Sequence, residues 1–209
     1  MKQGFGWEFI PAMFFHPRKT MARIVDGEHD EWVLVIAAAI GSSSALIQAS
    51  GWRIGLQYGF WPVLLAALVA GGLYGVLSLY LNGWLLTVSG RWMGAKGSFG
   101  TVRAALAWGR TPMLAACLVF IMQLIMFGDQ VFGVTNRSLG SSDALREFYS
   151  LSNIAITVLS IWSLVTTVAA LSEVQRLSVA KTFSNLLIAG LLLLPLLILI
   201  VVLFGVFNH

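Results

Sequence analysis

The chain has 209 residues, of which 58% are hydrophobic and only 11% charged, and its mean hydropathy is +0.84. Soluble domains carry about a quarter charged residues, so the composition excludes an ordinary soluble protein, and the apolar content of nearly every window excludes a disordered one. Thirteen Lys and Arg against nine Asp and Glu give a net charge of +4. In so apolar a chain, this excess indicates charges beside a membrane, and no nucleic-acid partner is expected.

Five stretches are apolar and long enough to cross a bilayer as helices, which takes about 20 residues. They cover residues 32–50, 62–89, 104–127, 151–172 and 183–207. The third is apolar from Thr111 onward and is expected to begin near Ala104, and Pro195 predicts a kink in the fifth. No ionisable side chain is expected inside a span, which argues against a proton-coupled pump.

The sequence therefore predicts an all-α integral membrane protein with five transmembrane helices. Residues 1–31 form an N-terminal interfacial segment, and residues 32–209 form the membrane domain. Ten of the 13 Lys and Arg residues lie before the first span or in the second-to-third and fourth-to-fifth connections. Because basic residues are retained on the cytoplasmic side, the N-terminus is expected in the cytoplasm and the C-terminus across the membrane.

Two segments are predicted to be amphipathic helices that lie in the cytoplasmic interface. The first covers residues 17–26, because Pro17 suits a first helical turn and Gly27 suits a helix end. Its apolar residues, which share one face, are Met21, Ile24 and Val25. Its basic residues Arg18, Lys19 and Arg23 can reach lipid phosphates.

The second segment covers residues 98–110, in which Phe99, Val102 and Leu106 follow helical spacing and Arg103 and Arg110 lie seven residues apart. Both segments have two interpretations: they dock lipid headgroups or a partner, or they only fix the depth and topology of the chain. The docking hypothesis rests on Arg18, Lys19, Arg23, Arg91, Lys96, Phe99, Arg103 and Arg110.

Three short motifs occur in order along the chain: HPRKTM at residues 16–21, GAKGSF at 94–99 and LSEVQRLSVAK at 171–181. Together they resemble the Yip family (Ypt/Rab-interacting membrane proteins). The resemblance implies a five-span protein with a cytoplasmic N-terminus. Eukaryotic members act in vesicle traffic and bind small GTPases through a long cytosolic N-terminal region. Only about 31 residues precede the first span here, so the chain resembles a compact bacterial-type member in the inner membrane.

Polar and small residues inside the spans predict helix packing. Gly71 and Gly75 form a Gly-x-x-x-Gly pair, which lets another helix approach closely, within the bundle or at a dimer interface. Five amide side chains either pair with neighbouring helices or line a polar path; they are Gln48, Asn82, Gln123, Asn153 and Asn185.

The sequence offers little catalytic chemistry. No motif for nucleophilic, metal-dependent or nucleotide-dependent catalysis is present, so neither an enzyme nor a cofactor is expected. The acidic residues 26–31 could hold a divalent cation, but a solvated turn before the first span is the stronger interpretation. The leading hypothesis is a membrane-organising or trafficking-like adaptor that binds anionic lipid, a membrane-protein partner or a second copy of itself. The alternative is a small-solute transporter or channel.

Overall fold

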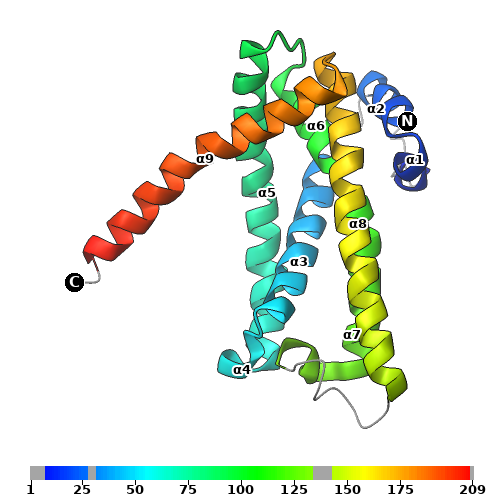
Figure 1. The fold of residues 1–209 in the computed structure, drawn as a ribbon, viewed down its shortest axis with the longest axis vertical. Helices are drawn as coiled ribbons and strands as arrows, with labels where there is room; N and C mark the ends of the chain where they lie inside the picture. Colours follow the sequence, from blue (N-terminus) through cyan, green and yellow to red (C-terminus); the bar gives the residue numbers. More distant parts are fainter. Residues whose placement is uncertain (1–7, 28–31, 134–142, 208–209) are drawn as a thin grey trace.

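The computed structural model describes residues 8–27, 32–133 and 143–207, and every regular element within them is helical. The elements are α1 (Phe9–Phe15), α2 (Pro17–Asp26), α3 (Val33–Gly51), α4 (Gly55–Tyr58), α5 (Phe60–Trp92), α6 (Phe99–Gly109), α7 (Pro112–Phe127), the 3-10 turn η2 (Gly128–Phe132), α8 (Asp143–Gln175) and α9 (Val179–Phe207). As Figure 1 shows, α3, α5, α7 and α8 run along one another, whereas α9 crosses α5 and then leaves the bundle.

Four segments are long and apolar enough to cross a membrane: α3, α5, the run from α6 to η2, and α8. A fifth, shorter apolar helix covers Val179–Pro195 at the start of α9. The predicted all-α membrane architecture with about five spans is therefore confirmed. The helices are longer than the apolar stretches, because α5 and α8 extend into polar residues at their ends.

The closest helix pair is α3 and α5, which meet at glycines. A Cβ atom added to Gly75 would lie 2.8 Å from the Gly41 Cα and closer still to the carbonyl oxygen of Ala37. One added to Gly71 would lie 2.6 Å from the Cβ of Ala45. The Gly-x-x-x-Gly pair thus lies against α3 of the same chain, where only glycine leaves room for the neighbouring backbone.

The third span is broken into α6 and α7 at Arg110 and Thr111. The side chain of Ser98 caps α6 by accepting a hydrogen bond from the Thr101 amide at 3.2 Å. Pro112 opens α7 at a position where a missing amide donor costs little. Turn-type hydrogen bonds carry the backbone across the break, as from the Thr111 amide to the Trp108 carbonyl at 3.1 Å.

The apolar face of residues 98–110, which were predicted to form an interfacial helix, packs against the bundle. Within α6, Val102 and Leu106 are fully buried in the bundle. The Thr166 hydroxyl of α8 donates to the Gly109 carbonyl at 2.6 Å, and a Cβ on Gly109 would lie 2.7 Å from the Thr167 Cα. Helical periodicity revealed an apolar face correctly, but that face packs on protein instead of lipid.

Helix α2 begins and ends at the residues predicted, Pro17 and Asp26. On its predicted apolar face, Met21 and Ile24 are buried against the bundle, whereas Val25 is exposed. Helix α1 is fixed beside it, where the Trp162 indole donates to the carbonyl of Phe14 at 3.2 Å. The two helices therefore form part of the folded domain.

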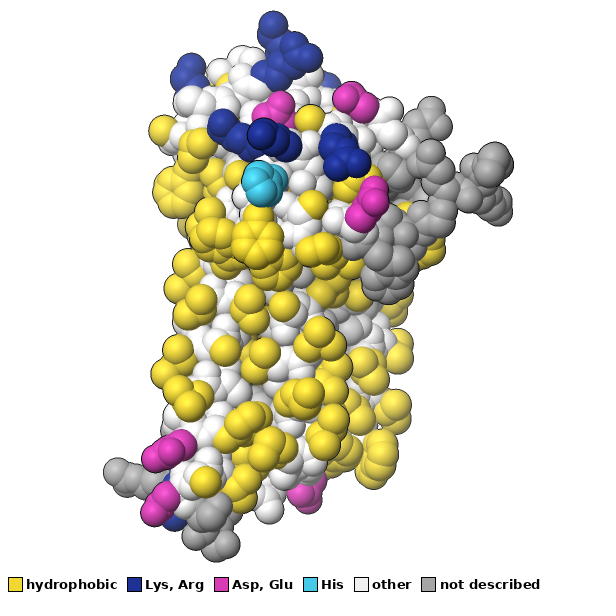
Figure 2. Space-filling model, turned by 90° about the vertical axis from the view of Figure 1, so that its right-hand side faces the viewer, with side chains coloured by type: hydrophobic (Ala, Val, Ile, Leu, Met, Phe, Trp, Pro, Cys, Tyr) yellow, Lys and Arg dark blue, Asp and Glu magenta, His cyan; other side chains and the backbone are white. Residues whose placement is uncertain are grey.

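Charge is segregated along the bundle axis. We call the end that carries α2, the α5–α6 loop and the α8–α9 loop the basic end. Figure 2 shows most Lys and Arg side chains gathered at this end, with a broad band of hydrophobic side chains below it. A band of hydrophobic side chains with charged residues beyond its edge is typical of the surface that the hydrocarbon core of a bilayer covers.

Candidate functional site

Five of the eight residues of the docking hypothesis are exposed at the basic end: Arg18, Lys19, Arg23, Arg91 and Lys96. The Arg18 guanidinium donates to the Ser172 hydroxyl at 2.9 and 3.1 Å. Arg23 lies 3.8 Å from the Glu8 carboxylate, and both side chains are exposed, so this ion pair contributes little to stability. The five cations share one solvated surface.

Sequence reasoning did not assign a binding role to Arg176 and Lys181, which are also exposed and follow α8. The count of Lys and Arg that predicted orientation already included both residues, so the sequence carried the signal that could have assigned them. With them, the basic surface combines three segments that are distant in sequence: α2, the end of α5 with the following loop, and the α8–α9 loop with the first turn of α9.

Arg103 and Phe99 do not belong to this surface. The Arg103 guanidinium carbon lies 4.6 Å from the ring centre of Tyr80 and 5.0 Å from that of Phe99. A Cβ added to Gly83 would lie 2.8 Å from the Arg103 Cγ. These cation–π contacts join α5 to α6, so the Arg103 side chain takes part in the packing of the two helices.

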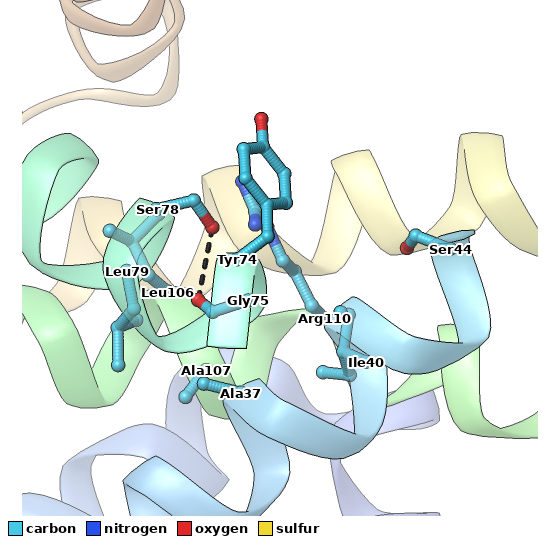
Figure 3. Close-up of a pocket in the computed structure, with 11 residues that line it drawn as sticks. Ala37, Ile40, Ser44, Tyr74, Gly75, Ser78, Leu79, Leu106, Ala107 and Arg110 are labelled. Carbon is cyan, nitrogen blue, oxygen red and sulfur yellow. Dashed lines mark hydrogen bonds between the residues drawn. The ribbon is translucent and has the colours of Figure 1, made fainter. Parts of the chain in front are cut away.

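Among the predicted docking residues, Arg110 has the location that differs most from the prediction. It lies within the apolar run Phe99–Phe132, so the expectation that no span contains an ionisable residue is wrong. Its side chain faces a cavity of about 60 Å³ between α3, α5 and α6. Figure 3 shows it extending toward the ring of Tyr74, with Ser44 and Ser78 on the flanking helices.

The three motifs noted in the sequence meet at the basic end. Arg18 of the first motif bonds Ser172 of the third. The Lys96 amide of the second motif donates to the Gln175 carbonyl of the third at 3.1 Å. A Cβ on Gly97 would lie 2.9 Å from the Val174 carbonyl oxygen. The end of α8 therefore holds both other motifs in place.

A family model described as the Yip1 domain matches residues 12–203, nearly the whole chain. The chain belongs to the Yip family. Comparison with curated proteins and with solved structures gave no match. The matched range of the Yip domain includes the whole basic surface and Arg110. The Yip family is a membrane-protein family that is not known as enzymatic.

Behind the basic surface, the Yip domain contains a buried amide network. Asn185 of α9 donates to the Leu86 carbonyl and to the Gln175 side chain, both at 3.1 Å, and accepts from the Ser89 hydroxyl at 2.5 Å. Gln175 also donates to the Leu86 carbonyl at 3.1 Å. A Cβ on Gly90 would lie 3.0 Å from both amide nitrogens. The network fastens the start of α9 to α5 and α8.

The other amides within the spans have local partners. Gln123 donates to Ser152 at 2.6 Å, which joins α7 to α8. The remaining three donate to carbonyl groups of their own helices: Asn82 to Ser78, Asn153 to Tyr149 and Gln48 to Ser44. Of these contacts, only the bond from Gln123 to Ser152 joins two helices, and the other three are local to one helix.

The acidic run lies largely outside the part of the chain that the structure describes. Asp26 and Gly27 end α2, whereas residues 28–31 are not among the described residues. Within residues 8–27, 32–133 and 143–207, no group of three potential metal ligands is found.

Proposed function

We propose that this Yip protein is a non-enzymatic membrane-organising protein whose basic end binds anionic lipid headgroups. The observation that carries the proposal is the basic surface itself, in which exposed cations from three segments are held together at the end of α8. Each Lys or Arg near an anionic membrane surface contributes about 1 kcal/mol to binding, and salt screens the attraction.

Aromatic side chains beside the basic surface support the same interpretation. Phe15 and Trp92 are 79% and 68% exposed and belong to α1 and α5 at the basic end. Large aromatic rings favour the boundary between headgroups and hydrocarbon. They would keep the nearby cations at headgroup depth.

We expect that changing Lys19, Arg91, Lys96 and Arg176 together to glutamine lowers retention of anionic lipid at least tenfold. These exposed side chains lie in no buried contact of the fold, so stability should be preserved. The measurement is native mass spectrometry of protein released from nanodiscs of mixed phosphatidylglycerol and phosphatidylcholine, at low and high salt. The matched control is the double variant R53Q/R146Q at the opposite end.

Equal retention by the quadruple variant and the wild type would refute lipid docking. If the quadruple variant retains lipid but no longer captures an acidic protein partner in pull-downs, the surface recognises protein. That result would also refute the lipid proposal. The R53Q/R146Q control should retain as much lipid as the wild type at each salt concentration, because those side chains lie away from the basic surface.

We further propose that the basic end faces the cytoplasm of a bacterium and that the protein lies in the inner membrane. The bias of Lys and Arg toward this end supports that orientation. A reporter that works only outside the cytoplasm should be active after His209 and inactive at Met1. Activity at both termini, or at neither, would contradict a five-span arrangement.

A further inference from the structure

We propose that Arg110 binds the oxyanion of a single-chain anionic lipid inside the bundle, with the alkyl chain lying in the groove between α3 and α5. The site lies apart from the basic surface, and neither proposal depends on the other. The ligand class is a long-chain carboxylate or phosphate monoester, because both present a compact anion on one alkyl chain.

The first step is the depth of Arg110. The residues of α3 that line its cavity run from Ala37 to Ser44, which places them about 6–16 Å along the helix from Val33. The hydrocarbon core of a bilayer is about 30 Å thick. With the edge of the hydrocarbon core placed at Val33, where α3 begins, the guanidinium lies below the headgroups, within the half of the core nearer the basic end.

The second step is the missing counter-charge. Residues 32–128, which include α3, α5, α6 and α7, contain no Asp or Glu, and neither does α9. The carboxylates of α8 are Asp143, Glu147 and Glu173, near its two ends. No carboxylate is among the residues that line the cavity. A cation at this depth without an anionic partner is costly, so an anion from outside the chain is strongly favoured.

The third step is the shape and polarity of the cavity. Its volume of about 60 Å³ is several times the roughly 10–15 Å³ that one water molecule requires. Ser44 and Tyr74 bring hydroxyl groups to its lining, whereas the Ser78 hydroxyl donates to the Gly75 carbonyl at 3.0 Å. Hydroxyls beside a guanidinium are the donors that an oxyanion accepts from.

The fourth step is the path for the alkyl chain. Tyr74 also lines a groove of about 670 Å³ that runs between α3 and α5 toward Pro62. Alanines form much of its wall; they are Ala45, Ala49, Ala66, Ala67 and Ala70. From Tyr74 to Pro62 the groove extends for roughly 18 Å along α5. An amphipath with its anion at Arg110 would place its chain here.

A second groove of the bundle provides a natural comparison. It lies between α1, α3 and α7, has a volume of about 730 Å³, and is also lined mainly by apolar side chains. No Lys, Arg, His, Asp or Glu is among its lining residues. Ordinary lipid chains can cover this groove, but nothing in it selects an anion. Selectivity for an anionic amphipath is therefore expected only beside Arg110.

The test uses the whole protein in neutral detergent, with oleate as the probe and methyl oleate and inorganic phosphate as comparisons. Wild type should bind oleate one to one in native mass spectrometry and melt at a higher temperature with it. Arg110→Gln should weaken oleate binding at least tenfold, whereas Arg110→Lys should retain part of it. Arg146→Gln removes one arginine far from the site and should bind as the wild type does.

A second pair of variants tests the groove without altering Arg110. Ala70→Trp fills the groove beside Tyr74 and should abolish oleate binding, whereas Ala39→Trp fills the other groove and should preserve it; both alanines are exposed. Oleate binding that survives in Arg110→Gln or in Ala70→Trp would overturn the proposal. Equal stabilisation by phosphate or methyl oleate would also overturn it, because the site would then recognise the anion or the chain alone.

Discussion

Replacing Gly75 with alanine is expected to destabilise the bundle by about 3 kcal/mol. The new methyl group would meet the backbone of α3, with the Gly41 Cα at 2.8 Å. A backbone cannot rotate aside as a side chain can, so α3 and α5 would have to separate along their contact. The measurement is the midpoint of thermal unfolding in a mild detergent, followed by circular dichroism.

Gly190→Ala is the matched control, because it makes the same change in the helix interior of α9, where an added Cβ has no atom within 4 Å. Alanine favours helix by about 1 kcal/mol relative to glycine, so this control should be neutral or slightly more stable. The two variants thus have effects of opposite sign. If both melt with the wild type, the α3–α5 contact is not as close as the structure has it.

Asn185→Ala is expected to destabilise the protein by about 2 kcal/mol and to release the start of α9 first. The change removes three hydrogen bonds of the amide network and leaves the Gln175 side-chain oxygen without Asn185 as its donor. A buried polar group that loses its partner costs about 1–3 kcal/mol. Hydrogen exchange measured by mass spectrometry should show faster exchange around residues 179–189 than in α3.

Asn153→Ala is the control for this prediction. Asn153 is exposed and donates only to the Tyr149 carbonyl of its own helix, so its loss should change the unfolding midpoint little. Similar losses for the two variants would show that the network at Asn185 has no special role. Asn185→Asp should resemble Asn185→Ala, because it would bury a carboxylate beside the Gln175 oxygen.

The all-α class and the approximate number of spans could be predicted from sequence because long apolar runs have few alternatives in a membrane. Local signals also located α2, because the backbone of Pro17 favours a helix start and that of Gly27 favours a helix end. Local sequence does not show what an apolar face packs against, because the packing partner depends on the whole fold. Met21 and Leu106 satisfied an amphipathic pattern, yet both are buried against other helices.

Arg110 shows a second limit of the sequence. Arg110 directly precedes Thr111 and Pro112, so in the sequence it resembles the last residue of a loop. The count of Lys and Arg therefore places it in the connection between the second and third spans. The span expected from Ala104 onward already included it, and the apolar segment of the structure begins five residues earlier, at Phe99. The fold joins α6, α7 and η2 in one apolar segment, Phe99–Phe132, which is long enough to cross a membrane. Similarly, sequence spacing could not predict that residues as distant as Ser89 and Asn185 would share one network.

The attachment of α9 determines the outline of the protein in the plane of the membrane. The helix is fastened near its first turns by Asn185 and then diverges from the bundle (Figure 1). Its 29 residues correspond to roughly 43 Å of helix. A neighbouring molecule that diffuses past on that side therefore contacts the projecting α9 before it contacts the bundle. The membrane area that the protein covers as it rotates is larger than the cross-section of the packed bundle.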